Sequence, residues 1–184
     1  GSYLTRLQEG NSFGSIYGFR YKGVYQYDKY EEGRGGTAPV VKDANGNVVK
    51  DANGKPLPMY FDYFNLGNKR YQFRGGDAIY EDINHDGTID ELDIVYLGNS
   101  NPKLTGGFGT NITFKNFSIS AFFNFRYGNK IVNYARMDAE NMHSNNNQSI
   151  AVNWRWRKDG DVTEMPRALY NYGYNYLGSD RFVE

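Results

Sequence analysis

The most regular pattern of hydrophobic and polar residues in the chain covers residues 103–128. Apolar and polar side chains alternate through 103–115 and alternate again through 116–129. A period of two residues is typical of a β-strand, because successive side chains point to opposite faces. Two such runs on either side of Lys115-Asn116 predict an antiparallel hairpin with a two-residue turn.

The same turn fixes which residues face each other across the hairpin. It predicts that Phe114 faces Phe117 and that Ile112 faces Ile119 on an apolar face, while Thr113 faces Ser118 on a polar one. A slip by one residue would exchange the two faces. About 12 residues per strand is slightly more than the 9 to 11 that cross a bilayer when tilted. A hairpin that packs on the core of a soluble β-sandwich would show the same alternation, so periodicity leaves both structures open.

A third alternating segment covers residues 14–28. Its aromatic residues occupy odd positions and its charged or polar residues even ones, which predicts a strand with one aromatic face. Gly18 and Gly23 interrupt this pattern and predict a bend or a close backbone approach. The remaining stretches, 29–102 and 130–184, are polar and are predicted to be long loops. Such long loops are unusual in a compact soluble domain.

One loop contains a tandem repeat. Residues 42–46 and 50–54 both read Lys-Asp-Ala-Asn-Gly, and each Asn-Gly pair is a turn signal. Two copies are too few for a solenoid. We expect a short hairpin or a flexible excursion here.

Composition narrows the class of protein. The chain has 184 residues, 17% aromatic residues and 22 glycines, which fits strands and polar loops. The 21 basic and 21 acidic residues give no net charge, so nucleic acid is not an expected partner. Without cysteine there are no disulfides or thiol chemistry. The chain contains no run of 18 apolar residues, so no membrane-spanning helix is predicted. Strands of a membrane barrel remain compatible with the pattern.

One segment matches the template of a calcium-binding loop. The template places oxygen ligands at positions 1, 3, 5, 7, 9 and 12, with glycine at position 6. In this chain Gly87 occupies position 6, and Asp93 stands at position 12 where a longer glutamate is usual. The six predicted ligands are Asp82, Asn84, Asp86, Thr88 (through its carbonyl), Asp90 and Asp93. A loop closed by aspartate and asparagine side chains without any ion is the alternative, and either structure would stiffen the loop without catalysing a reaction.

Other candidate sites are weaker. Trp154 and Trp156 could stack on a sugar or a base, although packing within a loop or an aromatic girdle is the commoner use of such residues. The pairs Asp62 with Glu81 and Asp159 with Asp161 could serve a hydrolase, but nothing in the sequence brings either pair around a scissile bond. We therefore predict that the protein is not an enzyme.

Several segments, taken in order, are similar to one family. They are 14–26, 76–90, 97–103, 123–129, 155–162 and 179–184. Together they resemble the C-terminal region of the SusC/RagA-type TonB-dependent outer-membrane transporters of Bacteroidetes, and the resemblance covers nearly the whole chain.

The resemblance implies an all-β fold with antiparallel strands and long loops, a slice of a transmembrane barrel of about 22 strands with an N-terminal plug. On this interpretation residues 1–184 belong to the barrel, with extracellular loops near 29–102 and 130–184, and the plug and the closing C-terminal strands are expected to be missing. The family imports glycans or peptides with a SusD-like lipoprotein and with energy relayed through TonB. The hairpin would meet outer-membrane lipid.

Candidate substrate-facing residues follow from the same resemblance. They are Trp154, Trp156, Tyr172 and Tyr174, whose rings could stack on sugars or peptide side chains. The alternative function is a soluble, calcium-stabilised β module that binds carbohydrate or protein. The two functions differ in what covers the apolar face of the hairpin.

Overall fold

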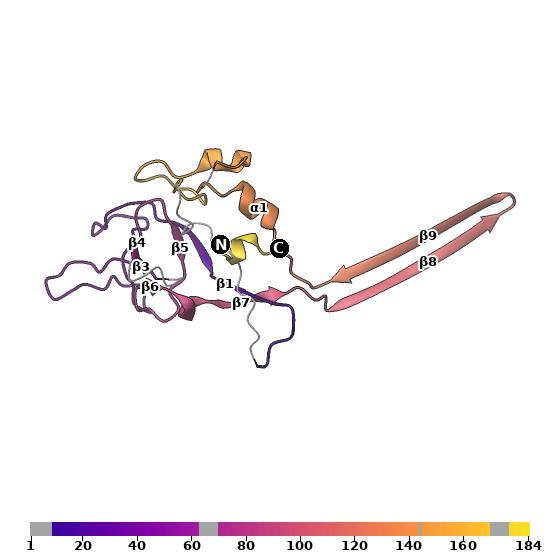
Figure 1. Ribbon diagram of the computed structural model, residues 1–184, viewed down its shortest axis with the longest axis horizontal. Helices are drawn as coiled ribbons and strands as arrows, with labels where there is room; N and C mark the ends of the chain where they lie inside the picture. Colours follow the sequence, from indigo (N-terminus) through magenta and orange to yellow (C-terminus); the bar gives the residue numbers. More distant parts are fainter. Residues whose placement is uncertain (1–8, 63–69, 144, 170–176) are drawn as a thin grey trace.

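Strands dominate the computed structural model, which describes residues 9–62, 70–143, 145–169 and 177–184. The chain forms a body of short strands and loops, from which one long hairpin projects (Figure 1). Within the described ranges there is a single α-helix, α1 (Tyr134–Ala139). Most strand pairs are antiparallel. The predicted all-β class with antiparallel strands is confirmed.

The projecting hairpin consists of β8 (Leu104–Phe114) and β9 (Phe117–Tyr127). Its register is the predicted one, with Phe114 facing Phe117 and Leu104 facing Tyr127. Lys115 in the turn has a positive φ of 52°. Nearly all residues of both strands are exposed on both faces. The sequence therefore determines this element locally, without help from the rest of the body.

The segment 14–28 differs from its prediction, because it is two strands and not one. β1 (Ser15–Gly18) pairs with β7 (Val95–Asn99), whereas β2 (Tyr21–Val24) pairs with β5 (Ala78–Tyr80). The break follows Gly18, where a Cβ atom would overlap the carbonyl oxygen of Gly178. Phe19 donates its backbone N–H to that oxygen at 2.9 Å. The C-terminal segment thus takes the backbone bonds that a continuous strand would have used.

The region 29–102, predicted as loop, contains most of the hydrophobic core. β3 (Tyr60–Phe61) lies between β4 (Tyr71–Gln72), which is antiparallel to it, and β6 (Thr88–Ile89), which is parallel. The core beneath these strands is made of Phe19, Tyr25, Val41, Met59, Phe61, Phe73, Ala78, Tyr80, Ile89 and Leu177. Five of these ten are aromatic, and their rings meet edge-on or tilted, as in Phe61 with Phe73. The odd-numbered aromatic residues of 14–28 thus supply part of this core.

The tandem repeat forms two adjacent turns, as predicted. Isolated bridges join Lys42 to Val48 and Lys50 to Pro56. Gly46 and Gly54 take positive φ values of 85° and 78°, a conformation that favours glycine. Each turn is closed by an aspartate whose side chain accepts two backbone N–H groups.

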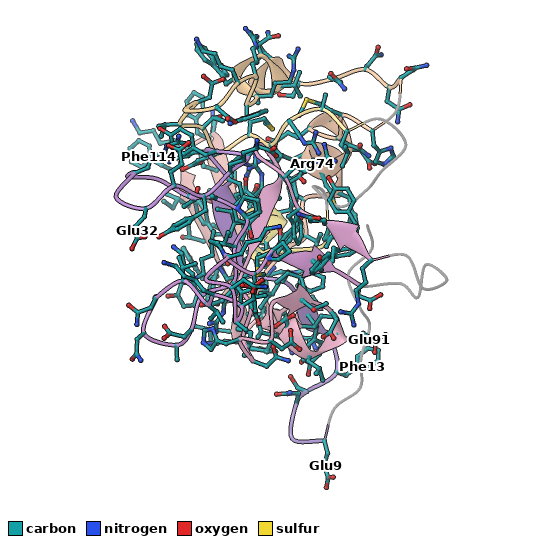
Figure 2. The ribbon with its side chains drawn as sticks, turned by 90° about the vertical axis from the view of Figure 1, so that its left-hand side faces the viewer. Glu9, Phe13, Glu32, Arg74, Glu91 and Phe114 are labelled. Atoms are coloured by element: carbon teal, nitrogen blue, oxygen red, sulfur yellow. The ribbon has the colours of Figure 1, made fainter. Side chains whose placement is uncertain are left out.

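The segment 130–184 carries little regular structure in the residues that the structure describes. It contains α1 and the short 3₁₀ helices η2 (Ile150–Trp154) and η4 (Asp180–Phe182), while η1 (Glu91–Asp93) lies earlier in the chain. A second small cluster joins Met142, Val152 and Met165. Side chains crowd the interior of the body, whereas Glu9, Glu32 and Glu91 point outward (Figure 2).

Both ends of the hairpin are bonded to the body. Ser100 donates its backbone N–H to Gly14 at 2.9 Å, and Lys130 donates to Asn99 at 2.7 Å. Ile131 and Glu184 exchange two backbone bonds of 2.9 Å. The hairpin therefore emerges from a hydrogen-bonded neck formed by residues 99–103 and 128–131. In the part of the chain that the structure describes, no helix combines the length and hydrophobicity needed to cross a membrane.

Candidate functional site

The predicted calcium loop closes on itself through its own polar side chains. The Asp82 carboxylate accepts the backbone N–H of Gly87 at 2.8 Å, and the Asp86 carboxylate accepts that of Thr88 at 2.8 Å. Asn84 accepts from the Asp86 N–H at 3.2 Å. Gly87 has a φ of +83°, and a Cβ there would lie 2.5 Å from Val41, so only glycine fits at position 6. The loop is thereby seated against the core.

Asp93, the residue at position 12, turns back into the loop. It is fully buried, and its two oxygens accept the backbone N–H groups of Ile83 at 2.7 Å and Asp90 at 2.9 Å. Asp90 in turn accepts from Leu92 at 2.7 Å, which completes the capping box of η1. Burial raises the pKa of Asp93 to about 6, against the lowering effect of the two backbone N–H groups.

One oxygen of the loop stands apart from this pattern. Oδ1 of Asp82 is buried and has no hydrogen-bond partner. A buried carboxylate oxygen without a partner is costly, and a bound cation is one way to compensate it. Among the described residues, however, no three His, Cys, Asp or Glu side chains approach closely enough to hold a metal ion. A loop closed without any ion explains the other contacts but not this oxygen, so calcium stays a prediction.

The four predicted substrate-facing aromatic residues have different surroundings. Trp154 ends η2 and its side chain is 76% exposed. Trp156 is partly buried, donates its indole N–H to the carbonyl of Gln26 at 3.1 Å and packs over Gly76. Tyr172 and Tyr174 lie outside the described residues. Of the two tryptophans, Trp154 is the more exposed to solvent.

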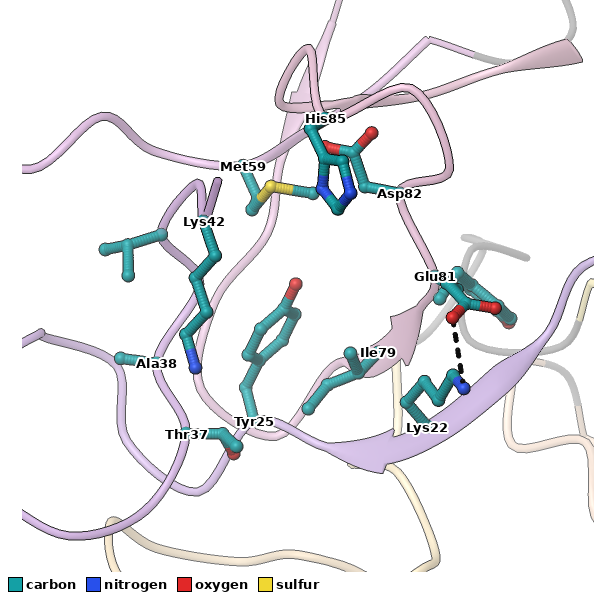
Figure 3. Close-up of a pocket in the computed structure, with 12 residues that line it drawn as sticks. Lys22, Tyr25, Thr37, Ala38, Lys42, Met59, Ile79, Glu81, Asp82 and His85 are labelled. Atoms are coloured by element: carbon teal, nitrogen blue, oxygen red, sulfur yellow. Dashed lines mark ion pairs between the residues drawn. The ribbon is translucent and has the colours of Figure 1, made fainter. Parts of the chain in front are cut away.

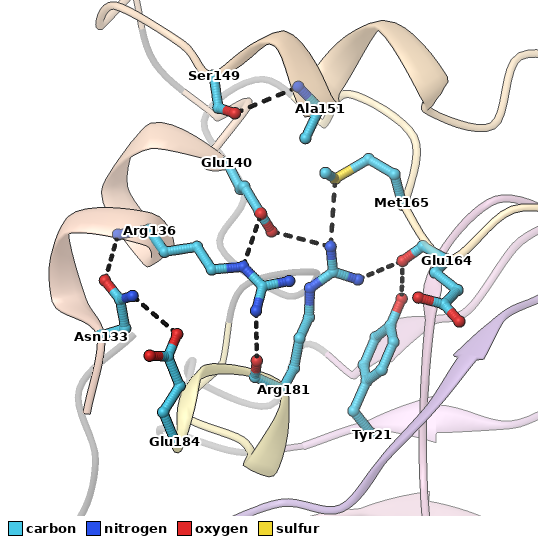
Figure 4. A network of polar contacts seen from close by, with 10 residues as sticks. All are labelled: Tyr21, Asn133, Arg136, Glu140, Ser149, Ala151, Glu164, Met165, Arg181 and Glu184. Atoms are coloured by element: carbon cyan, nitrogen blue, oxygen red, sulfur yellow. Dashed lines mark hydrogen bonds and ion pairs between the residues drawn. The ribbon is translucent and has the colours of Figure 1, made fainter. Parts of the chain in front are cut away.

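A network that the sequence did not reveal ties the C-terminal segment to the body (Figure 4). Glu140 is buried and accepts from Arg136 and from Arg181, each at 2.8 Å. Arg181 also donates to the carbonyl of Glu164, which accepts the Tyr21 hydroxyl at 2.5 Å. Burial raises the pKa of Tyr21 to about 12, although the charge of Arg181 acts in the opposite direction. The network holds α1, η4 and β2 together.

A second ionic contact lies inside the body. Asp77 is fully buried, and its carboxylate accepts hydrogen bonds from Arg167 at 2.6 Å and from the Tyr71 hydroxyl at 2.7 Å. Arg167 also donates to the Tyr71 oxygen at 2.8 Å. The backbone N–H of Arg74 completes the shell of the carboxylate at 2.8 Å. The contact joins residues that are 90 positions apart, which is why no local pattern predicted it.

The hairpin offers two contrasting surfaces. Its apolar face carries Leu104, Phe108, Ile112, Phe114, Phe117, Ile119, Phe123, Phe125 and Tyr127, whose exposed fractions run from 43% to 76%. Phe108 and Phe123 stack at 5.0 Å between ring centroids. On the other face, Ser120 donates to Asn111 at 2.5 Å and Thr113 lies 3.3 Å from Ser118. No described residue of the body covers the apolar face.

Comparison with known proteins places this strand-rich chain within one class, the TonB-dependent receptors. TonB-dependent receptor P39 of Formosa agariphila is 30% identical over 203 aligned residues, which cover 100% of this chain and 18% of the relative. TonB-dependent receptor P3 of the same organism is 28% identical over 91% of this chain and 14% of the relative. TonB-dependent receptor P26, also from Formosa agariphila, is 31% identical over 50% of the chain and 9% of the relative. No family model matches the sequence.

The chain thus corresponds to a segment of a TonB-dependent receptor, as its resemblance predicted. It spans less than a fifth of the length of the curated relatives that it matches. The three relatives carry names of receptors and not of enzymes.

Proposed function

We propose that the chain forms part of the wall and the external loops of a SusC-like outer-membrane transporter. In this proposal β8 and β9 are neighbouring strands of the barrel, and the body lies on the extracellular side. The complete protein imports glycans or peptides, works with a SusD-like lipoprotein and takes its energy through TonB. We assign no catalytic role to the chain.

The observation that carries the proposal is the exposed apolar face of the hairpin. An isolated two-stranded hairpin is marginally stable in water, and a contiguous apolar patch of this kind marks a surface that another medium or chain covers. A soluble module would bury the face in its own core, yet the core of the body lies elsewhere and contains none of these residues. This difference favours the transporter over the soluble calcium-stabilised module.

The dimensions of the hairpin also fit a bilayer. Each strand has 11 residues. At roughly 3.3 Å per residue and a tilt of about 40°, such a strand rises about 28 Å, close to the roughly 30 Å of hydrocarbon in a membrane. The side chains of the polar face would then point into the barrel, where water, the plug and the substrate are expected.

A matched pair of substitutions tests this proposal. Phe123 and Asn124 lie at the same depth on opposite faces of β9. We expect Phe123→Arg to destabilise the protein folded in lipid vesicles by about 2 to 4 kcal/mol, since its charge would enter hydrocarbon, and Asn124→Arg to cost under about 1 kcal/mol. The measurement is denaturant unfolding in vesicles of the complete receptor that contains this chain, because two strands alone would leave unpaired edges in lipid. Equal costs at the two positions would contradict a lipid-facing surface.

The external loops are where the partners would bind in this proposal. Trp154 is our preferred candidate for stacking on substrate, because its ring is exposed. Trp156 could contact substrate only with the part of its ring that Gly76 and Gln26 leave uncovered. Tyr172 and Tyr174 stay predictions from the resemblance.

We further propose that the loop 82–93 holds a structural calcium ion. Asp82, Asn84, Asp86 and Asp90 would contribute side-chain oxygens, Thr88 its carbonyl, and Asp93 a carboxylate that can accept further contacts beside its two backbone bonds. Support comes from the buried, partnerless Oδ1 of Asp82. The ion would supply the positive charge that this oxygen lacks.

Calcium binding can be tested with a control from the same chain. A ligand that binds only the folded state at 100 times its Kd stabilises that state by about 2.7 kcal/mol, so the melting temperature should fall when a chelator is added. We expect Asp82→Asn to abolish this response. Asp43→Asn should retain it, because Asp43 closes a similar turn with both oxygens partnered. A melting temperature that does not respond to calcium would contradict the proposal that the loop binds this ion.

A further inference from the structure

A small cavity opens beside the loop 82–93, and its walls come from four separate segments of the body (Figure 3). Its volume is about 270 Å³. Tyr25, Met59 and Ile79 form an apolar floor, together with Ala38 and Val40 on one side. The polar rim consists of Lys22, Lys42, Glu81, Asp82 and His85. An apolar floor with a few converging polar groups is the usual composition of a small-molecule site.

The rim carries two lysines and two carboxylates, but not all of them are paired with each other. Glu81 is engaged by Lys22 at 3.2 Å and by Arg20 at 3.1 Å, and these contacts lower its pKa despite partial burial. One oxygen of Asp82 accepts the Gly87 N–H, and the other is the partnerless Oδ1 for which a calcium ion is proposed above. Lys42, by contrast, makes no ion pair with any described residue. One ammonium group is therefore left to attract an anion at the mouth of the cavity.

The tandem repeat shows that this arrangement is particular to the first copy. Lys42 and Lys50 occupy the same position in two identical five-residue sequences and in turns of the same kind. Lys50 lies 3.4 Å from Glu32 and outside the cavity, whereas Lys42 lines the cavity. The local sequence is the same, so only the surroundings give Lys42 its place in the cavity wall.

The hydroxyl of Tyr25 adds a second polar group. The residue is buried, but its hydroxyl makes no hydrogen bond within the described ranges and points into the cavity (Figure 3). Burial, with the nearby charges of Asp77 and Asp82, raises the pKa of Tyr25, so that the hydroxyl stays protonated and can donate. Lys42 and Tyr25 thus offer two donors above an apolar floor.

We propose that this cavity binds a small amphipathic anion, whose apolar body rests on Met59 and Ile79 and whose carboxylate faces Lys42 and Tyr25. A cavity of about 270 Å³ has room for one amino-acid residue and is slightly smaller than a drug-sized site. The C-terminal residue of a peptide with a branched apolar side chain has this chemistry. The proposal does not depend on transport, because every residue that it uses belongs to the body.

N-acetyl-L-leucine is a suitable probe, with its neutral amide, N-acetyl-L-leucinamide, as the comparison. A ligand of this size that buries one side chain should bind with a Kd on the order of 1 mM. The experiment is a titration of the full chain in a non-ionic detergent, followed by ligand-observed NMR. We expect the amide to bind at least tenfold more weakly, because it lacks the charge that Lys42 recognises.

Three substitutions locate the site. Lys42→Gln should weaken binding of N-acetyl-L-leucine about tenfold, whereas Lys50→Gln in the second repeat should leave it unchanged. Ala38→Leu should also weaken binding, since it narrows the cavity from its edge without removing a core contact. Melting curves identify any variant that fails to fold. Equal effects of Lys42→Gln and Lys50→Gln, equal binding of acid and amide, or no saturable binding by the wild-type chain would each overturn the proposal. The Phe123→Arg test of the hairpin is unaffected by any of these results.

Discussion

The body and the hairpin share the same alternation of aromatic and polar residues, but their aromatic faces have opposite surroundings. In the body, the aromatic side of 14–28 points inward, and Phe19 and Tyr25 are at most 5% exposed. In the hairpin, the aromatic side of β8 and β9 points outward, with Phe117 76% exposed. The body strands are two to five residues long and the hairpin strands eleven. A period of two thus identifies a strand but does not say what its apolar face meets.

The difference lies in where the partners of each strand come from. Every pairing of the hairpin is made by a neighbour across a two-residue turn. In the body, Ser15 pairs with Asn99 and Val24 with Ala78, so the chain must bring distant segments together before any face is buried. Long-range contacts supply a core for the body, whereas the hairpin leaves its apolar face exposed.

The largest effect should come from emptying the core of the body. Phe61 is 1% exposed, so Phe61→Ala should destabilise the fold by about 3 to 5 kcal/mol through lost burial and a residual cavity. Phe123→Ala, at a 54% exposed ring, should cost much less because it creates no cavity. Denaturant unfolding measures both. Comparable losses would mean that the hairpin ring is packed as tightly as the core ring.

A somewhat smaller effect is expected from the ionic contact inside the body. Arg167→Met would leave the fully buried Asp77 carboxylate without its cation, at a cost of about 3 kcal/mol. The double variant with Asp77→Asn should recover part of this loss, since the neutral amide is cheaper to bury. Arg126→Met on the exposed polar face of the hairpin serves as the control and should change the free energy of unfolding by less than about 0.5 kcal/mol. A loss of similar size at Arg126 would argue against the distinction between the two regions.

The smallest expected effects concern the turns. The body turn uses Gly46 at a φ of 85°, whereas the hairpin turn places Lys115 at 52°. Gly46→Ala should therefore destabilise by about 1 kcal/mol, and Lys115→Gly should stabilise the hairpin by up to about 1 kcal/mol. Hydrogen exchange of the amides beside each turn reports the two changes separately. Opposite signs are the expected result, and a loss at both positions would show that Lys115 is not strained.

The hairpin could be predicted to the residue because its information is local. Alternation and a two-residue turn fix the register, and Phe114 faces Phe117 as expected. The turns at Gly46 and Gly54 were predictable for the same reason. The segment 14–28 was predicted as one strand, which is wrong. The close backbone approach predicted at Gly18 is confirmed, but its partner is the distant Gly178, which no local pattern identifies.

In the candidate sites, too, local contacts could be predicted from the sequence and long-range contacts could not. A turn closed by aspartate and asparagine side chains was one of the two structures that the sequence left open for the loop 82–93, and the bond from Gly87 to Asp82 fits such a turn. The inward turn of Asp93 onto Ile83 and Asp90 could not be read from the spacing of the loop residues. The cavity beside Lys42 and the contacts of Arg181 with Glu140 join segments far apart in the chain, so no window of sequence contains them.

The hydrogen-bonded neck gives the hairpin a fixed direction relative to the body. Backbone bonds from Ser100 to Gly14 and from Lys130 to Asn99 restrain both strands where they leave the body, and the bonds between Ile131 and Glu184 restrain the chain just beyond. Swivelling at this junction would require several of these bonds to break together. In the proposed transporter, any tilt that the bilayer imposes on the hairpin would thus be passed to the body and would set the direction in which the body faces.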